Sequence, residues 1–428
     1  MGRDFARFAR IVSYVLLSAP SFAMAEPLSL ARVLDAVRSH NPAIAGAQAR
    51  ADAAGSIPAR ARAYDDPVVS WEAWNIPEPV AVDRADNNIF RLSQRIPFPG
   101  KRTLAGEMAE RDAETMRHDV GEVELDAVTT AKRAYADLWR AHQTLAVSRR
   151  DFELTERVAR LVEQRYATGG TSQADVLRAQ VEVSHVASEL RTAELAIEDA
   201  AAGLNAVMSE PPDAPLGMPE DPAPPALPPA PSELIERALR DRPEVAARDA
   251  AVARETTGER LAGKGLLPDF EVSVGRFVNN DASNGFGAMA SMTVPLAWKG
   301  KYDAGVAEAK ARVLSAEADR RRATDGIRRD VQQAYLRAKT ALVQHDLFAG
   351  THLPHAEQAL HVTEAAYVAG DTDLTTLLET VRNLQRVHLE HVMATAEFEK
   401  DYADLERAVG ADLPRPAASH ATMRRSRP

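Results

Sequence analysis

The chain has 428 residues, 27% of them charged and 45% hydrophobic, which is enough for two ordinary domains or for one long, elongated domain. It contains no cysteine, and this excludes disulfides, thiolate metal sites and a lipid attached to an N-terminal cysteine. Its formal net charge of −10 argues against nucleic acid as a partner.

Residues 1–25 have the pattern of a signal peptide. Three arginines precede a short apolar run over residues 11–17, and small residues lead up to a cleavage site after Ala25. The apolar run is far shorter than the roughly 20 residues that a membrane-spanning helix needs. We therefore expect the chain to be exported and processed to a mature form that starts at Glu26.

A first structural unit is predicted over residues 26–210, in the order helix, two strands, long helix, second long helix. Its first helix covers roughly 29–63, and Pro42 marks a kink or a break near the start of that helix. No proline occurs from Lys101 to Ala167, where the good helix formers Ala, Glu, Arg and Leu dominate. At 1.5 Å per residue, a helix over this stretch is on the order of 100 Å long.

Two strands are predicted between the first and second helices of this unit. Apolar side chains alternate with polar ones in both, at Val69, Trp71 and Ala73 in the first strand and at Phe90, Leu92 and Ile96 in the second. Gln94 interrupts the apolar face of the second strand. Each segment approaches the ~9–11 residues that cross a bilayer as a tilted strand. A hairpin of an ordinary soluble sheet has the same pattern.

A proline-rich linker follows over residues 211–231, with ten prolines in 21 residues. Proline at this density cannot continue a helix and favours extended chain. A disordered linker has the same composition, but this segment must return the chain to the start of a second unit. We therefore expect a semi-rigid strap.

Residues 232–412 are predicted to repeat the first unit, and residues 413–428 to form a flexible tail. Three pairs of positions support the repeat, Pro42/Pro243 and Tyr166/Tyr367 at an offset of 201 residues and Lys101/Lys301 at an offset of 200. A long helix is predicted from Lys301 to Ala369, interrupted only by Pro354. One face of it carries apolar residues at three- and four-residue steps, at Ile327, Val331, Ala334, Ala338 and Leu342, which predicts coiled-coil packing.

The second unit also has two alternating segments. Their apolar positions are Phe270, Val272 and Val274 in one, and Phe286, Ala288, Ala290, Met292 and Val294 in the other. The exported chain therefore has four strands of roughly membrane length, and no window is apolar enough for a spanning helix. A bilayer does not tolerate open sheet edges, and the smallest membrane barrels have about eight strands. Several copies of the chain would have to contribute strands to one barrel.

Three motifs resemble those of the TolC-like outer-membrane efflux family. The run Pro97-Phe98-Pro99-Gly100-Lys101-Arg102 is similar to the segment where a strand of that family enters a long helix, especially in its heavy-metal cation branch. Residues 166–177 and 367–378 are similar to its helix-to-helix tips. The resemblance covers roughly 27–412. The second copy departs from the first motif, because Pro295-Leu-Ala-Trp-Lys-Gly-Lys301 has one residue inserted and one proline lost.

This resemblance implies a fold that is mainly α with a small β part, in which long antiparallel coiled-coil helices form a tunnel. It implies a homotrimer whose twelve-stranded transmembrane β-barrel contacts outer-membrane lipid and whose tunnel crosses the periplasm. The implied partners are a periplasmic adaptor (membrane fusion) protein and an inner-membrane pump of the RND type. The expected function is passive efflux of substrates to the exterior, with metal cations and heavy-metal resistance as one candidate. A soluble periplasmic coiled-coil adaptor or scaffold is the alternative, although it needs no strands of membrane length.

The candidate functional residues fall into three groups. The strand-to-helix turns comprise Pro97, Pro99, Gly100 and Lys101 in the first copy and Pro295, Gly300 and Lys301 in the second. The resemblance implies adaptor docking at the tips, over Gly169, Gly170, Thr171, Ser172, Gly370 and Thr372. Gly169 and Gly170 are expected to supply positive φ where the chain reverses. Asp371 and Asp373 are predicted to form a carboxylate ring at the tunnel entrance, to cap the following helix, or both.

No catalytic constellation is recognisable, because the chain lacks a thiol nucleophile, a Gly-x-Ser-x-Gly, a His-Glu-x-x-His and a phosphate-binding glycine loop. We therefore expect neither enzymatic activity nor a cofactor. His388 and His391 are weak candidates for metal ligands, because imidazole suits zinc, copper and nickel. Solvated helix residues explain them equally, and a duct must release its cargo, so no metal site is predicted.

Overall fold

The computed structural model describes residues 27–76, 85–223, 226–228, 230–279, 283–295 and 299–414. The predicted signal peptide and nearly all of the predicted tail lie outside these ranges. In the first copy the elements are α1 (Leu30–His40), α2 (Pro42–Arg62), β1 (Val68–Trp74), β2 (Asn87–Ile96), α3 (Lys101–Ala167) and α4 (Gln173–Met208). In the second copy they are α5 (Pro231–Asp241), α6 (Pro243–Gly263), the 3₁₀ turn η2 (Lys264–Leu266), β3 (Phe270–Asn279), β4 (Gly285–Met292), α7 (Lys299–Leu347), the π-helix η3 (Phe348–His352), α8 (Leu353–Ala369) and α9 (Leu374–Val409).

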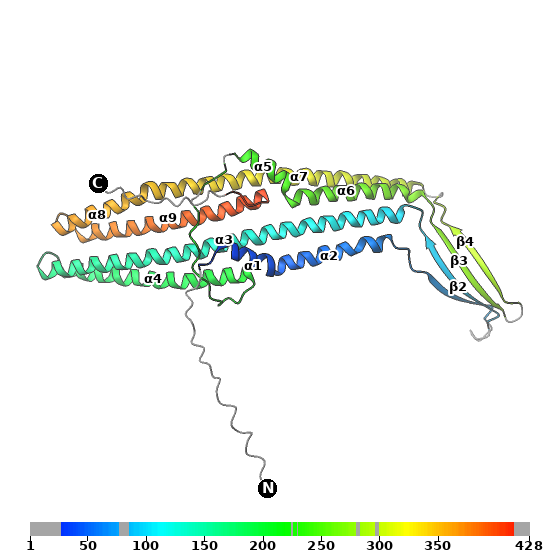
Figure 1. The fold of residues 1–428 in the computed structure, drawn as a ribbon, viewed down its shortest axis with the longest axis horizontal. Coiled ribbons are helices and arrows are strands. Elements are labelled where there is room, and N and C mark those ends of the chain that lie inside the picture. Colours follow the sequence, from blue (N-terminus) through cyan, green and yellow to red (C-terminus); the bar gives the residue numbers. More distant parts are fainter. Residues whose placement is uncertain are drawn as a thin grey trace, which may run out of the picture.

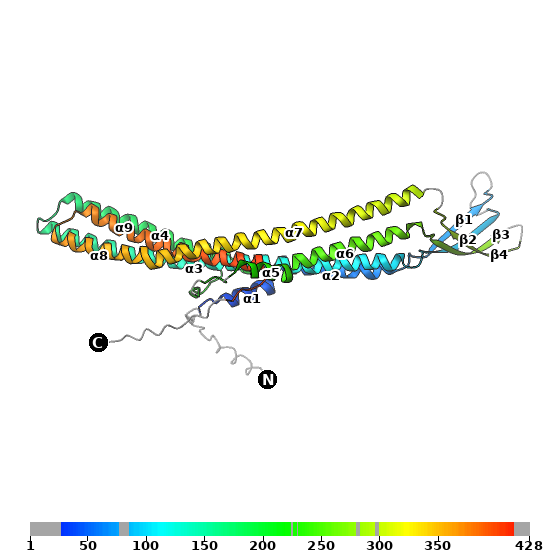
Figure 2. The ribbon, with the colours of Figure 1, turned by 90° about the horizontal axis from the view of Figure 1, so that it is seen from above.

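The helices form one long, narrow body with a small sheet at one end (Figures 1 and 2). At the opposite end the chain reverses twice, between α3 and α4 and between α8 and α9, and the two turns lie close to each other. We call these turns the first tip (residues 168–172) and the second tip (residues 370–373). Within the described ranges, no helix is both long enough and apolar enough to cross a membrane.

The first predicted helix is two helices, because the chain breaks at Asn41 between α1 and α2. The Asn41 side chain accepts a hydrogen bond from the backbone N–H of Ala43 at 2.9 Å, and so caps the new helix. Pro42 occupies the first position of α2, where its missing N–H leaves no bond unmade. The predicted break at Pro42 is thus confirmed.

The central helix of the body is α3, which runs unbroken for 67 residues as predicted. It packs against α2, α4, α6 and α9. Leu154, Val158 and Val162 follow one another at four-residue steps and are all buried, so they form part of one seam. Full burial of such a side chain stabilises the fold by about 1.5–3 kcal/mol. The helical body therefore draws its stability from long seams rather than from one compact core.

The corresponding helix of the second copy differs from the prediction. It begins at Lys299 instead of Lys301, and it loses α-helical geometry in the π-helix η3, just before Pro354. Proline has no N–H to donate and its ring collides with the carbonyl one turn earlier, so the chain adjusts by widening that turn. The predicted seam is confirmed, because Ile327, Val331, Ala334 and Ala338 are buried, and Leu342 packs against the cluster that contains the first three of them.

The four strands form a single antiparallel sheet in the order β1-β2-β3-β4. Each copy contributes one hairpin, and β2 pairs with β3 to join the two copies. β1 has 7 residues and β4 has 8, so both are shorter than the predicted 9–11. Val294 lies beyond the end of β4 at Met292, although the backbone N–H of Thr293 still bonds to the carbonyl of Asp269 at 2.9 Å.

The proline-rich segment runs along the helices in its described parts. Leu28 bridges to Pro219, and the hydroxyl of Tyr135 on α3 donates to the carbonyl of Leu28 at 2.7 Å. The same hydroxyl accepts a hydrogen bond from the backbone N–H of Glu220 at 2.9 Å. In the second copy the hydroxyl of Tyr335 donates to the carbonyl of Pro228 at 3.2 Å. One tyrosine from each copy therefore holds the segment against the helical body.

Candidate functional site

The sheet has one mainly apolar face and one mixed face that carries most of its charged side chains. The cross-strand register places Val69, Trp71, Ala73, Phe90, Leu92, Ile96, Phe270, Val272, Val274, Val278, Phe286, Ala288, Ala290 and Met292 on one face, here called the apolar face, together with Asn88, Gln94 and Arg276. The other face, here called the polar face, carries Ser70, Glu72, Arg91, Ser93, Arg95, Glu271 and Ser273 together with the apolar Val68, Trp74, Ile89, Phe277 and Met289. Val69 is 77% exposed and Phe286 is 81% exposed in the single chain. A contiguous exposed apolar face of this kind marks an interaction surface.

Asp269 organises the turn that leads from β2 into α3. Its carboxylate accepts hydrogen bonds from the Phe98 backbone N–H at 2.9 Å, from Lys101 Nζ at 2.9 Å and from Arg95 at 3.2 Å. Partial burial opposes its charge, but these donors hold the pKa of Asp269 below its usual range. Gly100 adopts a φ of +89° at the start of α3, a conformation that favours glycine. The predicted turn residues are thus held by an aspartate from the other copy.

The second copy does not reproduce this turn. Gly300 and Lys301 lie inside α7, which begins at Lys299. Pro295 is half-buried at the end of the sheet, and residues 296–298 lie outside the described ranges. The prediction that Gly300 and Lys301 form a strand-to-helix turn is therefore wrong.

The first tip closes by backbone hydrogen bonds that satisfy the last carbonyls of α3. Gly169 has a φ of +77°, and its N–H bonds to the carbonyl of Tyr166 at 3.0 Å. The N–H of Gly170 reaches back to the carbonyl of Arg165 at 2.8 Å. These two bonds make a Schellman motif, which needs only one left-handed residue. The expected positive φ is confirmed for Gly169 and wrong for Gly170.

α4 begins at the first tip with a capping box. The Ser172 side chain accepts from the backbone N–H of Asp175 at 3.2 Å, and the Asp175 carboxylate accepts from the Ser172 N–H at 3.2 Å. The Thr171 hydroxyl adds a bond to the same carboxylate at 2.7 Å. The bonds from Thr171 and Ser172 lower the pKa of Asp175. The sequence prediction missed Asp175, although Ser-x-x-Asp is a helix-start signal.

The second tip separates the two aspartates that were predicted to act together. Asp373 caps α9, because its carboxylate accepts from the backbone N–H of Thr376 at 2.8 Å, and this bond lowers its pKa. Asp371 does not cap the helix with its side chain; its backbone N–H bonds to the carbonyl of Ala366 at 2.9 Å. Gly370 supplies the positive φ of +90°. Both carboxylates are exposed at the end of the body.

Two arginine contacts that the sequence prediction missed join the tips. Arg165, at the end of α3, donates to the carbonyl of Tyr367 on α8 and lies 4.8 Å from the centre of its ring. Arg382 on α9 donates through Nε to Glu182 on α4 at 2.7 Å, and a second donor of the same guanidinium also reaches that carboxylate. Hydrogen bonding by Arg382 lowers the pKa of Glu182. The turns of the two copies are thus held as one unit.

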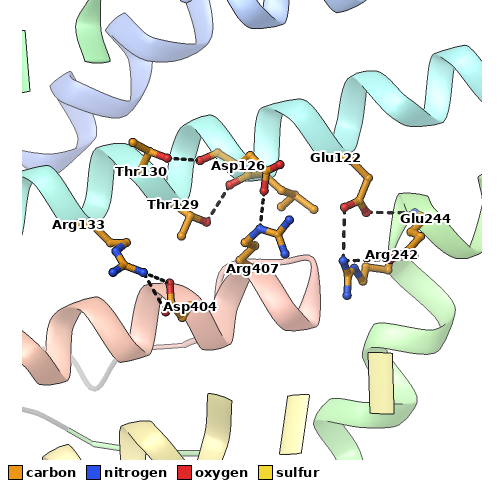
Figure 3. A network of polar contacts seen from close by, with 10 residues as sticks. Glu122, Asp126, Thr129, Thr130, Arg133, Arg242, Glu244, Asp404 and Arg407 are labelled. Atoms are coloured by element: carbon orange, nitrogen blue, oxygen red, sulfur yellow. Dashed lines mark hydrogen bonds and ion pairs between the residues drawn. The ribbon is translucent and has the colours of Figure 1, made fainter. Parts of the chain in front are cut away.

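A further polar network joins the copies near the middle of the body (Figure 3). Its three ion pairs run from α3 to the second copy, namely Arg133 to Asp404 at 3.0 Å, Asp126 to Arg407, and Glu122 to Arg242 at 3.4 Å. The Arg242 side chain is only 5% exposed and also lies 3.1 Å from Glu244. Figure 3 shows these side chains projecting from α3 toward α9 and the start of α6. Paired charges of this kind fix how the copies align.

Asp151 is a buried carboxyl in the half of α3 that leads to the first tip. It is 4% exposed, and its Oδ2 has no hydrogen-bond partner among the described residues. Burial, reinforced by the nearby charge of Glu189, raises its pKa to about 7, and the charge of Arg150 opposes this shift by less. The position was not predicted, because an aspartate in a charged helix gives no sequence signal of burial.

The weak metal candidates lie on α9 and face other helices. His388 is 4.0 Å from Glu357 on α8, and the ring of His391 is 5.2 Å from the ring of His345 on α7. Burial lowers the pKa of both His388 and His391. Within the described ranges, no group of three or more histidine, aspartate or glutamate side chains is arranged to hold a metal ion.

The profile of the family described as outer membrane efflux protein matches the chain twice, over residues 33–210 and over residues 234–411. The chain belongs to the outer membrane efflux protein family. Membership of this family gives the cell outer membrane as the location of the protein. The two matched segments follow one another in the chain and contain the two sets of helices and strands, so the predicted internal repeat is confirmed.

Two curated relatives resemble this family member in sequence. Protein CyaE of Bordetella pertussis is 26% identical over 283 residues, which cover 63% of this chain and 58% of that protein. The pyoverdine export outer membrane protein OpmQ of Pseudomonas aeruginosa is 24% identical over 314 residues, covering 68% of this chain and 63% of that protein. The matched regions thus span less than two thirds of either relative.

A solved structure shares the fold. The outer membrane protein VceC from Vibrio cholerae superposes with a TM-score of 0.74 at 18% identity, over 89% of this chain and 96% of that chain. The predicted fold class, long antiparallel helices with a small four-stranded part, is confirmed.

Proposed function

We propose that this protein is one subunit of a homotrimeric outer-membrane channel that conducts substrates passively to the exterior. The observation that carries the proposal is the four-stranded sheet, which has an exposed apolar face and two open edges, β1 and β4. Strands that cross a bilayer must close into a barrel, because lipid offers no hydrogen bonds to an open edge. Pairing β4 of one copy with β1 of the next closes the sheet, and three copies supply twelve strands.

The two faces of the sheet suit the two environments of a channel wall. The apolar face would contact lipid, and the polar face would line the passage. Glu72 and Arg91 pair at 2.9 Å on the polar face, as expected for charged groups beside water rather than hydrocarbon. The long helices would continue the passage across the periplasm.

We also propose that the two tips dock a periplasmic adaptor protein, which in turn joins an inner-membrane pump of the RND type. The tips carry the residues predicted for docking, and they lie at the end of the body farthest from the sheet (Figure 1). Leu177 and Val181 on α4 are 56% and 69% exposed beside this end and line a groove with Leu378 on α9. Exposed apolar side chains in a groove between helices suit the apolar face of a partner helix.

Asp371 and Asp373 are proposed to attract cations to the entrance. Three copies of the second tip around one axis would bring six carboxylates together, and a narrow mouth focuses their field. The capping bond of Asp373 uses one carboxylate oxygen and leaves the charge in place. Metal cations therefore remain a candidate cargo, carried through the passage rather than held at a site.

Edge pairing offers a direct test, since the chain has no natural cysteine. Val69→Cys in β1 combined with Ala288→Cys or Ala290→Cys in β4 should be joined between copies by a short bis-maleimide. The expected product is a ladder that ends at three chains, from protein recovered in the outer membrane with detergent. Val69→Cys alone is the matched control and should give no ladder. A soluble monomer with no cross-links from any pair contradicts the proposal.

A further inference from the structure

One row of side chains crosses all four strands on the apolar face. Trp71 pairs with Phe90, Phe90 with Arg276, and Arg276 with Phe286. Directly paired residues on neighbouring strands point to the same face, so these four residues form a continuous line, here called the aromatic row. The rings of Trp71 and Phe90 are stacked with centroids 6.5 Å apart. The guanidinium of Arg276 lies 4.7 Å from the centre of the Phe286 ring.

The aromatic row lies close to the ends of the two central strands. The row next to it on the helical side is entirely apolar and consists of Val69, Leu92, Val274 and Ala288. On the other side the next row consists of Ala73, Asn88 and Val278, and Asn88 accepts a hydrogen bond from the indole N–H of Trp71 at 3.0 Å. The central strands end one residue beyond that row, at Asn87 and Asn279. Aromatic side chains flank the apolar band of membrane strands at the level of the headgroups.

This level can be assigned to one side of the bilayer. The strands meet the helical body at the ends that carry Ile96, Phe270 and Met292. The aromatic row lies nearer the opposite ends, which point away from the helices (Figure 1). If the helices lie on the periplasmic side, as proposed above, the row faces the outer leaflet.

Arg276 is the charged member of the row, and it lacks a counter-charge within the described part of the chain. The arginines on the polar face are paired, Arg91 with Glu72 at 2.9 Å and Arg95 with Asp269 at 3.2 Å. Arg276 is exposed on the apolar face, and its described neighbour is an aromatic ring instead of a carboxylate. An arginine among lipid-facing side chains must reach the interface, where it can meet water and anionic groups.

We propose that Arg276 binds the phosphate of a lipid headgroup in the outer leaflet. The planar guanidinium presents a pair of N–H donors that matches two phosphate oxygens. The Phe286 ring restricts where the guanidinium can lie, and Trp71 and Phe90 supply apolar area beside the first carbons of the acyl chains. This inference rests on the proposed function, because it requires the apolar face of the sheet to lie in a bilayer.

The test compares lipids that differ in the phosphate alone. The full mature oligomer in detergent is mixed with phosphatidic acid or with diacylglycerol of the same acyl chains, and bound lipid is counted by native mass spectrometry. We expect the wild type to retain phosphatidic acid at least tenfold more than diacylglycerol. Arg276→Gln should lose this preference, and Arg276→Lys should keep part of it, because lysine preserves the charge but not the planar fork. Arg91→Gln removes one positive charge from the opposite face and should behave as the wild type.

Several outcomes would overturn the proposal. Equal retention of phosphatidic acid by the wild type and Arg276→Gln excludes Arg276 as the binding group. An equal loss in Arg91→Gln shows that total charge, rather than the aromatic row, governs binding. Displacement of phosphatidic acid by an equal concentration of inorganic phosphate assigns the site to free phosphate instead of a headgroup.

Each variant is first checked for its oligomer band on an unheated gel, and Arg276 is exposed, so its replacement should leave assembly intact. A wild-type oligomer that inserts into vesicles but shows no lipid preference contradicts the lipid site alone. Failure of the wild type to insert contradicts the proposed channel as well.

Discussion

The two copies of the repeat have the same order of elements but differ at equivalent positions. α3 is continuous over 67 residues, whereas its counterpart is divided by the π-helix η3 between α7 and α8. Asp151 in α3 corresponds to His352 in η3 at the repeat offset of 201 residues. In the first copy, Asn41 lies between α1 and α2 and caps α2. The equivalent position between α5 and α6 of the second copy is occupied by the buried Arg242.

The difference shows which features of the unit are general. The apolar seams, the helix reversals with one left-handed glycine and the hairpins occur in both copies, so they define the unit. The polar side chains at the junctions differ, because each has to meet the opposite copy and not its own equivalent. The Asp269 turn exists once for the same reason, since the aspartate comes from the second copy and its partners from the first.

The largest effect on stability is expected from replacing Asp151, because the continuous helix α3 buries its carboxyl group. A pKa raised from 3.8 to about 7 disfavours the charged form by up to about 4 kcal/mol. Below pH 4 both folded and unfolded chains hold the proton and no penalty exists. Between pH 4 and 7 the unfolded chain alone releases it, so stability falls as pH rises, and above pH 7 the penalty is complete.

Asp151→Asn should therefore raise the thermal midpoint of the protein several times more at pH 8 than at pH 4.5, where only about 1 kcal/mol of the penalty has developed. Glu189→Gln is the matched variant, because removal of that charge should weaken the pKa shift and give a smaller gain at pH 8. Thermal unfolding followed by circular dichroism at both pH values measures the difference. A gain of equal size at both pH values would contradict a titration effect.

The next effect is expected at the helix junctions, where the copies use different side chains. Arg242→Ala would leave Glu122 and Glu244 without their buried partner and should cost about 3 kcal/mol. Asn41→Ala removes a helix cap alone and should cost about 1 kcal/mol. Denaturant or thermal unfolding measures the loss of stability in each variant. Equal costs would mean that the buried arginine contributes no more than a cap.

Replacing the glycine of each strand-to-helix segment by alanine should change the stability of the protein in opposite directions. Gly100→Ala forces a side chain into a φ of +89° and places its Cβ 3.1 Å from Lys264, so a loss of about 1–2 kcal/mol is expected. Gly300→Ala lies in a helix with open space around it and should stabilise by about 0.5 kcal/mol. The change in thermal midpoint shows whether each variant is more or less stable than the wild type. Destabilisation by both would place Gly300 in a turn, as the sequence motif had suggested.

The smallest effect on stability is expected at the tips. Asn caps a helix nearly as well as Asp, so Asp371→Asn with Asp373→Asn should leave the thermal midpoint almost unchanged. Reconstituted channels of this variant should lose cation preference and block by divalent ions, because six charges disappear from the proposed entrance. Ser172→Ala at the first tip is the control, with a loss of about 1 kcal/mol and no change in selectivity. Unaltered selectivity in the double variant would leave capping as the role of Asp373.

Much of the fold could be predicted from the sequence, because it depends on local signals. Absence of proline and a regular apolar spacing are enough to predict α3, and alternation is enough to predict the four strands. The break at Pro42 and the left-handed Gly169 follow from the restricted or permissive backbones of those residues. These preferences act within a few residues of the chain, so they do not depend on which distant residues pack nearby.

The tertiary structure decided the features that join distant parts of the chain. Asp269 meets Lys101 across 168 residues and Arg382 meets Glu182 across 200, and nothing near either residue indicates its partner. The raised pKa of Asp151 depends on which side of α3 faces the other helices. Arg276 looks like any strand arginine until the register aligns it with three aromatic rings. Packing and register set these distances, and a charge takes its properties from the groups that packing places around it.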